Sequence, residues 1–275
     1  MLEFPEAVVI SQQLDKTIKG KKIKNIIAGY SPHKFAFFHG EPEDYCDLLS
    51  GKIVDTVRGY GGMVEVEVED TIILFADGIR IKFLSKEEKY PKKHQLLIEF
   101  EDSTALICSV QMYGGLWCFK EGQFDNPYYK VAKEKPSPLS KKFDKDYFEQ
   151  LISLPEVQEL SAKAFLATEQ RVPGLGNGTL QDILYNAKIH PKRKIKSLAD
   201  IDKEELFFSI KSTFDEMISH GGRDTEKDIF GSWGGYKTLM SRNTVNKPCP
   251  VCGAIIKKQS YMGGSIYYCE GCQML

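Results

Sequence analysis

The apolar positions at the start of the chain recur at helical spacing. They stand three or four residues apart, at Ala7, Ile10, Leu14 and Ile18, which is typical of a helix with one buried face. Pro5 suits the first turn of this helix, because a proline there gives up no hydrogen bond. Gly20 follows the last apolar position and indicates where the helix ends. The pattern therefore predicts a helix that opens near Pro5 and stops before Gly20.

Beyond this helix the apolar period changes to two. Side chains alternate between apolar and polar, and short turns separate most of the alternating segments, which predicts strands. We expect eight strands, over residues 22–29, 34–39, 52–58, 63–69, 71–75, 80–84, 95–100 and 105–110. A helix followed by many antiparallel strands predicts a β-sandwich with the helix at its edge.

A change of composition then divides the chain. Residues 130–142 are rich in lysine, proline and serine, which indicates a linker. Helical periodicity follows it, over 145–152, 157–168, 178–187 and 203–219. We therefore expect an α+β multidomain chain. Its predicted parts are a β-sandwich domain over 1–130, a linker over 131–142, a helical domain over 143–240 and a cysteine-bearing ribbon over 241–275.

Four cysteines close the chain in two Cys-x-x-Cys pairs, Cys249 with Cys252 and Cys269 with Cys272. Sixteen residues separate the pairs, and this arrangement is typical of a zinc site. Four thiolates complete a tetrahedral shell with no open position, so the expected Zn²⁺ is structural. Between the pairs, Gly263-Gly264 predicts the turn of a β-hairpin. Two disulfides or free thiols are the alternatives.

The overall composition narrows the function only slightly. Net charge is −1, so any contact with nucleic acid has to use local charge. The first residues carry neither a basic region nor an apolar stretch, and no run has the length of a membrane span. The remaining cysteines, Cys46, Cys108 and Cys118, stand singly. Lone thiols beside a metal-type cluster indicate a reducing compartment, so we expect a cytoplasmic protein.

One turn and one basic segment are candidates for binding phosphate. Residues 171–177 lie between two predicted helices, and Gly174 and Gly176 permit a tight turn there. Backbone N–H groups at a helix N-terminus bind phosphate, and Lys163 and the basic segment 188–196 would flank them. The simpler interpretation is a helix connection in which Asn177 caps the second helix, beside a solvated basic surface. The motif alone leaves both interpretations open.

Taken together, the motifs resemble those of one family. Over essentially its full length the chain is similar to the formamidopyrimidine-DNA glycosylase and endonuclease VIII family of base-excision repair enzymes. The residues that carry the resemblance are Glu3, Pro5-Glu6, His94-Gln95-Leu96, Phe100-Glu101-Asp102, Tyr113-Gly114, residues 172–177, Ile189-His190-Pro191, Gly221-Gly222, Asp228 and the four cysteines with Gln273. The resemblance implies a helix–two-turns–helix domain over 143–240, a zinc ribbon, a monomer at the bacterial nucleoid, and damaged or abasic duplex DNA as partner.

The resemblance also implies a chemistry for the N-terminus. In this family a terminal proline, freed by loss of Met1, attacks C1′ of an extruded nucleotide and forms a Schiff base, after which the strand is cut. Glu3 then has the part of a general acid. Glu6 helps to hold the N-terminal turn, although surface or helix-dipole placement is the simpler interpretation for it. The phosphate contacts fall on Lys163, Gly176, Asn177 and Gly264.

The chain departs from the family at several of these positions. Leu2 stands where the family has its proline. Methionine is usually retained before a bulky residue, so we expect the terminal amine on Met1, about 3.5 Å further out. Gly62 and Gly264 take the places of a lysine and an arginine that bind phosphate. Loss of two such cations weakens DNA binding and lowers its log–log salt slope by about two.

Three functions follow as hypotheses. The first is a DNA glycosylase with abasic-site lyase activity, which uses Glu3 and a terminal primary amine on Met1 or Leu2. The second is a lyase-silent protein that binds damaged DNA, and Leu2, Gly62 and Gly264 favour it. The third is an interaction module without a DNA role, which leaves the candidate phosphate turn without a purpose. We favour the first.

Overall fold

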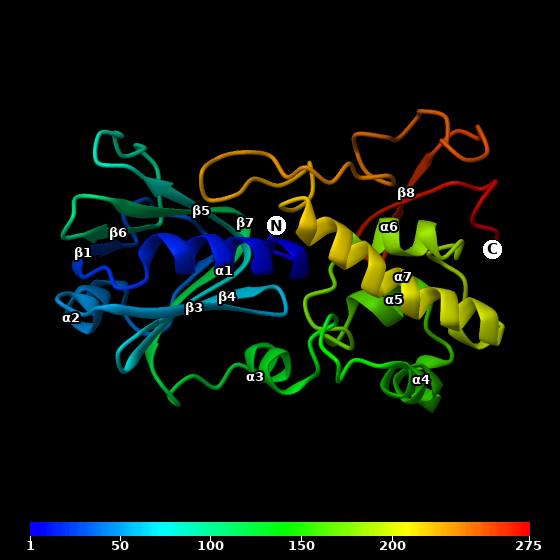
Figure 1. Cartoon of the computed structure of the whole chain (residues 1–275), viewed down its shortest axis with the longest axis horizontal. Coiled ribbons are helices and arrows are strands. Elements are labelled where there is room, and N and C mark those ends of the chain that lie inside the picture. The colour runs from blue at the N-terminus through cyan, green and yellow to red at the C-terminus, as the bar shows by residue number, and fades with distance from the viewer.

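The computed structural model describes residues 1–275 as a β half and a helical half, with the N-terminus between them (Figure 1). The β half comprises α1 (Phe4–Ile18), β1 (Ile23–Ala28), β2 (Ala36–Phe37), α2 (Tyr45–Leu49), β3 (Val54–Tyr60), β4 (Met63–Val68), β5 (Thr71–Leu84), β6 (Leu96–Phe100) and β7 (Ala105–Lys120). The helical half comprises α3 (Pro127–Glu134), α4 (Lys145–Ser153), α5 (Ala162–Ala167), α6 (Thr179–Asn186) and α7 (Asp200–Ser219), followed by the hairpin of β8 (Lys257–Tyr261) and β9 (Gly264–Tyr268). The expected α+β class is confirmed.

One sheet supplies the whole β half. Its strands follow the order β1-β6-β7-β5-β4-β3, and β2 pairs in parallel with β7. The long strands β5 and β7 pair along almost their whole length, residues 71–77 with 114–120 and residues 79–84 with 105–110. Apolar side chains from both stretches enter one core of 27 residues. The bent sheet therefore forms both layers of the expected sandwich.

The sequence predicted two strands where β5 is continuous. The register shifts between Asp77 and Ile79, and Asp77 has a φ of 61°. A Cβ at Gly78 would lie 2.5 Å from the carbonyl oxygen of Tyr113, so only glycine fits. Asp77 and Gly78 thus form a bulge that bends the strand without ending it.

Helix α1 joins the two halves. Ala7, Ile10 and Leu14 belong to the β core. Phe4, at the first position of the helix, belongs instead to a second core of 21 residues in the helical half, where its ring centroid lies 4.9 Å from that of Phe214. The residues just before α1 are therefore fixed at the boundary between the halves.

Other differences from the predictions are local. The predicted helix 157–168 is a 3₁₀ turn at Pro155–Val157 followed by α5, because Ser161 caps α5 by accepting the N–H of Ala164 at 3.2 Å. The short helices α2 and α3 were not predicted. We propose the expected segments 1–130, 131–142, 143–240 and 241–275 as folding units, with α3 spanning the first boundary.

The terminal hairpin has a different turn from the predicted one. Its central residues are Met262, at a φ of 51°, and Gly263, at 69°, whereas Gly264 begins β9. Positive φ at both central residues is typical of the turn that matches strand twist in two-residue hairpins. None of the helices is both long and apolar enough to cross a membrane.

Candidate functional site

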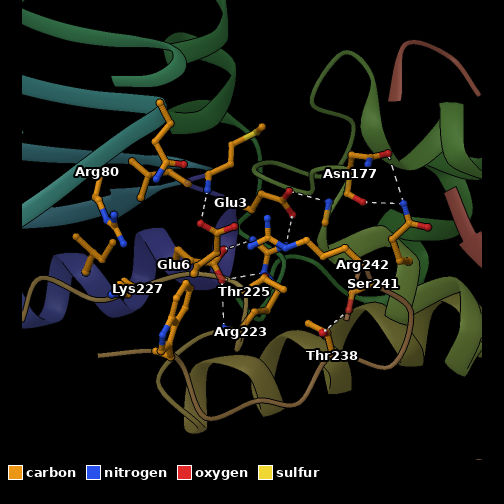
Figure 2. Close-up of a pocket in the computed structure, with 18 of the residues that line it drawn as sticks. Glu3, Glu6, Arg80, Asn177, Arg223, Thr225, Lys227, Thr238, Ser241 and Arg242 are labelled. Carbon is orange, nitrogen blue, oxygen red and sulfur yellow. Dashed lines mark hydrogen bonds and ion pairs between the residues drawn. The ribbon is translucent and has the colours of Figure 1, made fainter. Parts of the chain in front are cut away.

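A cavity of about 440 Å³ opens between the two halves, beside the N-terminus (Figure 2). Six parts of the chain line it: the N-terminal residues with the first turns of α1, the bulged part of β5, Gln111 of β7, the start of α6, the segment that follows α7, and Tyr267 of β9. Its volume lies within the range of known substrate sites. The terminal amine and two buried carboxylates share this cleft.

Glu3 ties the N-terminus to the first turn of α6. Its Oε1 accepts the N–H of Gly178 at 2.8 Å, and its Oε2 accepts that of Thr179 at 2.7 Å. Glu3 is buried. The carboxylate satisfies two N–H groups that lack partners within the helix and complements the helix dipole. The N-terminus of α6, which the sequence suggested as a phosphate site, is therefore occupied by a side chain of the protein itself.

Glu6 lies in the first turn of α1, as the helix-dipole interpretation requires, but it is buried, so the alternative of surface placement is wrong. It forms a two-point ion pair with Arg223, whose Nε donates to Oε1 at 2.8 Å and whose Nη2 donates to Oε2 at 2.6 Å. Nη1 of Arg223 also lies 3.4 Å from Oε2 of Glu3. Burial lowers the pKa of Arg223, but the two carboxylates outweigh burial and raise it above its usual value. Sequence reasoning missed Arg223, because nothing in its local pattern sets it apart.

The first two residues diverge in direction. The N–H of Leu2 donates to the carbonyl oxygen of Asp77 at 2.8 Å, and the Leu2 side chain is buried in the β core. Met1 is 39% exposed, and its terminal amine forms an ion pair with Glu226. Leu2 thus holds the deep position, while the amine of the intact chain lies at the cavity rim beside a carboxylate.

Glycines let the two halves touch at this point. The N–H of Phe4 donates to the carbonyl oxygen of Gly174 at 2.8 Å. A Cβ at Gly174, which has a φ of 75°, would lie 2.3 Å from the backbone of Gly61. A Cβ at Gly62 would lie 3.1 Å from the carbonyl oxygen of Leu2. The position that holds a lysine in the resembled family is therefore tightly packed here.

The turn before α6 presses against Glu3. A Cβ at Gly176 would lie 2.5 Å from the Glu3 carboxyl carbon, which leaves room only for glycine. The expected Asn177 cap is wrong, because α6 begins after Gly178 with no side-chain cap from its own segment. Asn177 instead donates from Nδ2 to the carbonyl oxygen of Ser265 in β9 at 3.0 Å. Asn177 therefore fixes the turn to the terminal hairpin.

Three of the residues expected to contact DNA converge at that hairpin. Lys163 is buried and donates from Nζ to the carbonyl oxygen of Tyr261 at 2.6 Å. A Cβ at Gly264 would lie 3.4 Å from Lys163 Nζ and 3.5 Å from Asn177. Burial lowers the pKa of Lys163. The structure thus brings Lys163, Asn177 and Gly264 into one small surface.

The basic segment 188–196 is less available than its sequence suggests. Lys194 and Lys196 both pair with Glu159, at 2.9 and 2.6 Å. Arg193 pairs with Asp202 at 2.7 Å. Lys192 lies without an ion pair, 5.3 Å from the ring centroid of Tyr261. Three basic side chains of the segment are therefore already paired, whereas Lys192 lies beside the hairpin.

Three other cations face the cavity, and sequence reasoning missed them because they stand apart in the chain. These cations are Arg80, Lys227 and Arg242, and none of them makes an ion pair within 4.0 Å. Figure 2 shows Arg80 and Lys227 on one side of the buried carboxylates and Arg242 on the other. Unpaired cations around a cleft create a positive potential that attracts anions.

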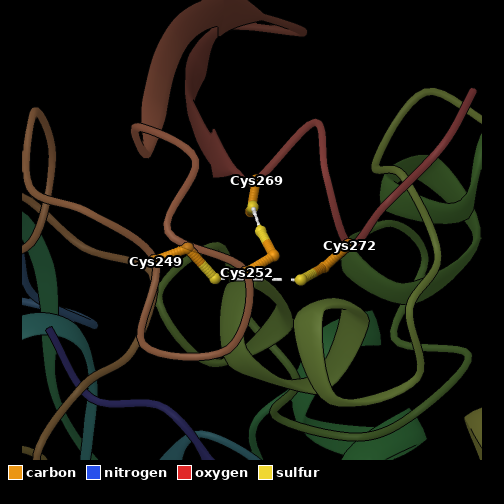
Figure 3. A group of neighbouring side chains, drawn as sticks. All are labelled: Cys249, Cys252, Cys269 and Cys272. Carbon is orange, nitrogen blue, oxygen red and sulfur yellow. Dashed lines mark hydrogen bonds between the residues drawn. The ribbon is translucent and has the colours of Figure 1, made fainter.

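The four cysteines gather their sulfurs at one point (Figure 3). All Sγ atoms lie within 4.8 Å of one another. The separations of 3.7 Å for Cys249 with Cys272 and 3.3 Å for Cys252 with Cys269 are far longer than a disulfide bond of about 2.05 Å. They approach the spacing of about 3.8 Å for thiolates around tetrahedral Zn²⁺. The cluster can therefore hold a metal ion.

A neighbouring hydroxyl favours the thiolate form of Cys249. Tyr185 of α6 lies 3.1 Å from Cys249 Sγ. Burial raises the pKa of Cys249, but this hydrogen bond and the neighbouring backbone N–H groups outweigh burial and lower it to about 6. A thiolate with a hydrogen-bond donor outside the shell is the form that ligates metal.

No family model matches the chain. It is 25% identical to the formamidopyrimidine-DNA glycosylase of Bacillus anthracis over 279 residues, 99% of each chain. It is 27% identical to that of Wolbachia pipientis over 281 residues, 99% of this chain and 100% of the relative.

Solved structures extend the likeness to the fold. One is a complex of Lactococcus lactis Fpg with DNA that contains an abasic site, with a TM-score of 0.84 and 25% identity. Another is a complex of the same protein with DNA that contains Fapy-dG, with a TM-score of 0.83 and 26% identity. Each match covers 99% of this chain and 100% of the other.

Proposed function

We propose that this divergent member of the formamidopyrimidine-DNA glycosylase family binds duplex DNA with a damaged base or an abasic site, excises the base and cuts the strand. One observation carries the proposal in this chain. The carboxylate of Glu3 is anchored on α6 inside the cavity that also holds the terminal amine. A nucleophile beside a fixed carboxylate is the arrangement that base excision through an imine requires.

The chemistry assigns one task to each group. The amine nitrogen bonds to C1′ of the extruded nucleotide while the bond from C1′ to the base breaks, and the base departs with that electron pair and takes up a proton. Glu3, whose carboxylate accepts two N–H groups, takes up the proton that the attacking nitrogen loses and passes it to the departing base. Breaking of the C1′–O4′ bond then leaves an imine, and loss of a C2′ proton expels the 3′ phosphate.

The position of the terminal amine limits the rate of imine formation. On the intact chain the amine belongs to Met1 and has to leave Glu226 before it attacks. Loss of Met1 would place the amine on Leu2, at the carbonyl oxygen of Asp77. A nucleophile displaced by about 1 Å can lose roughly 10²-fold in rate, so we expect slow imine formation from Met1.

DNA contacts are proposed for the surface where the turn before α6 meets the hairpin. Lys163, Asn177 and Lys192 lie there, and the open position at Gly264 lies between the first two. The unpaired Arg80 and Arg242 offer further phosphate contacts at the cavity. We expect a monomer that works in the cytoplasm at the nucleoid.

We propose Zn²⁺ for the four-cysteine cluster. A closed four-thiolate shell supplies folding energy to a segment too small for its own core and takes no part in the reaction. Cys249, Cys252, Cys269 and Cys272 would hold the ion, and Tyr185 would orient the shell through Cys249. The ribbon so formed keeps the hairpin against Asn177.

Borohydride trapping on an abasic-site duplex tests the enzyme. The parent protein should give a covalent complex slowly, and mapping of the trapped peptide should place the link on the terminal amine. Glu3→Gln should trap less while it still binds the duplex. An intact mass of the same preparation identifies Met1 or Leu2 as the first residue.

A second function, binding of damaged DNA without chemistry, is favoured by the Met1–Glu226 ion pair, which holds the amine away from Leu2. In that case the duplex would be bound tightly and no complex would be trapped at any time. Absence of both binding and trapping would remove both functions.

A further inference from the structure

Trp233 is a large aromatic side chain that the structure leaves open to the cavity. It is 56% exposed and lines the same cleft as Glu3 and Met1. Exposure of an indole costs hydrophobic free energy, and exposed aromatic rings in nucleic-acid-binding proteins serve as stacking surfaces for bases. The segment 223–236, here called the strap, carries this residue.

The strap holds Trp233 on a rigid hairpin. Its two arms are joined where Gly234 donates to the carbonyl oxygen of Glu226 at 3.1 Å and Asp228 donates to that of Ser232 at 2.9 Å. A Cβ at Gly234 would lie 2.2 Å from the carbonyl oxygen of Gly222. Only glycine therefore fits beside Trp233, and the strap packs directly against the backbone of Gly222.

The strap is also attached at its first residue and at its tip. Arg223 is locked to Glu6. At the tip, Ile229 is buried in the core of the β half, and its carbonyl oxygen accepts the N–H of Phe83 at 2.8 Å. Figure 1 shows the strap after α7 as it crosses back toward the β half. Trp233 thus has a fixed position relative to both halves and to Glu3.

Lys227 sets the orientation of the indole. Lys227 and Trp233 face each other across the strap hairpin, and Lys227 Nζ lies 4.8 Å from the ring centroid. A cation over one face is attracted by the ring quadrupole. One face of the indole is therefore covered by the ammonium group and the residue is still 56% exposed, so stacking would use the other face.

We propose that Trp233 is the stacking platform for the extruded base and that it selects flat, fully conjugated bases over ring-saturated ones. The proposal rests on the proposed function and adds the basis of its selectivity. Stacking needs two flat π-faces in contact. A pyrimidine saturated at C5 and C6 is puckered and has lost ring conjugation, so it cannot lie flat on the indole.

Three duplexes of the same sequence, which differ only at one nucleotide, test the proposal. They carry 8-oxoguanine as the flat damaged base, 5,6-dihydrouracil as the saturated base, and tetrahydrofuran as a site without a base. Trp233→Leu should weaken binding of the 8-oxoguanine duplex by roughly 5- to 150-fold. It should leave binding of the tetrahydrofuran duplex unchanged, and the parent should prefer 8-oxoguanine over dihydrouracil.

Two variants separate stacking from structure. Trp233→Phe keeps a flat ring and should restore most of the affinity. Phe230→Leu is the matched control, because Phe230 is an exposed aromatic residue of the same strap that does not line the cavity, and it should change nothing. An equal loss on the tetrahydrofuran duplex, or no loss on the 8-oxoguanine duplex, would overturn the proposal.

Fluorescence gives a readout independent of activity. The chain has two tryptophans, so Trp117→Phe leaves Trp233 as the only indole. Its emission should be quenched by the 8-oxoguanine duplex and not by the tetrahydrofuran duplex. Equal quenching by both duplexes would contradict stacking. A protein that binds none of the three duplexes would instead refute the proposed function.

Discussion

Arg223 and Glu6 form a buried, two-point ion pair at 2.8 and 2.6 Å although 217 positions separate them in the chain. The pair joins α1 to the segment after α7, and Arg223 also approaches Glu3. A charged group buried in this way is stable only with its partners present. The N-terminal segment is therefore positioned by a residue from the opposite half.

Loss of Arg223 should be costly. Arg223→Met would leave Glu3 and Glu6 as neighbouring buried carboxylates, so we expect the free energy of unfolding to fall by about 3–5 kcal/mol. Urea denaturation measures it. Arg58→Met is the control, because Arg58 pairs with Glu67 at the surface, and such pairs contribute about 1 kcal/mol or less. Equal effects of the two variants would show that the buried network does not stabilise the fold.

A cation can be restored at the hairpin. A Cβ at Gly264 meets only ordinary contacts at 3.4 and 3.5 Å, so Gly264→Arg should fold normally. One added phosphate contact should tighten binding to abasic duplex and steepen the log–log salt slope by about 0.9. Titrations at several salt concentrations measure the slope. Gly264→Gln, of similar length but uncharged, should leave it unchanged, and a steeper slope for this variant would contradict the charge argument.

The cysteine cluster should bind one metal ion per chain. Cys249→Ser should lose the metal, measured by elemental analysis, and should weaken DNA binding because the hairpin is no longer held against Asn177. The β half should keep its structure, since the cluster packs in a separate small core. Cys46→Ser removes a thiol outside the cluster and serves as control. Parent protein without metal would refute the site.

Asn177→Ala should weaken binding to abasic duplex without unfolding the chain. The side chain makes a single hydrogen bond to the hairpin, at Ser265, and its loss should cost about 0.5–1.5 kcal/mol of stability. If Asn177 also contacts phosphate, the free energy of DNA binding should weaken by more than this loss of stability. Asn186→Ala removes a comparable bond, from Asn186 to Thr213 at 2.9 Å within the helical half. Equal DNA affinities of the two variants would exclude the phosphate contact.

Asp182 should make stability depend on pH. Burial raises its pKa from 3.8 to about 6, although the N–H groups of Leu239 and Met240 oppose the rise. The folded state then binds more protons than the unfolded state between these values, so this contribution is complete below pH 3.8 and is lost as pH rises through about 6. As pH rises through that window, the free energy of unfolding of the parent should fall by about 3 kcal/mol relative to that of Asp182→Asn. Parallel stability curves would contradict the assignment.

Several features could be read from the sequence because each depends on local chemistry. Apolar spacing predicts α1, α4, α6 and α7, since a helix buries one face wherever its partner lies. The spacing of the four cysteines predicts their cluster, because two short loops fix the sulfurs in pairs. Motifs that follow one another along the chain were sufficient to show the resemblance to formamidopyrimidine-DNA glycosylases, with which the chain shares 25% and 27% identity.

Only the tertiary structure decided how the candidate site is arranged. It placed Glu3 on α6, paired Glu6 with Arg223, moved Asn177 from a helix cap to the hairpin, and neutralised much of the segment 188–196. Each of these depends on which distant residue lies opposite, and charge and hydrogen-bond capacity are the same in sequence whether a partner is near or absent. The sequence therefore determined the elements and the family resemblance, while packing between the halves determined which polar groups remain free to act.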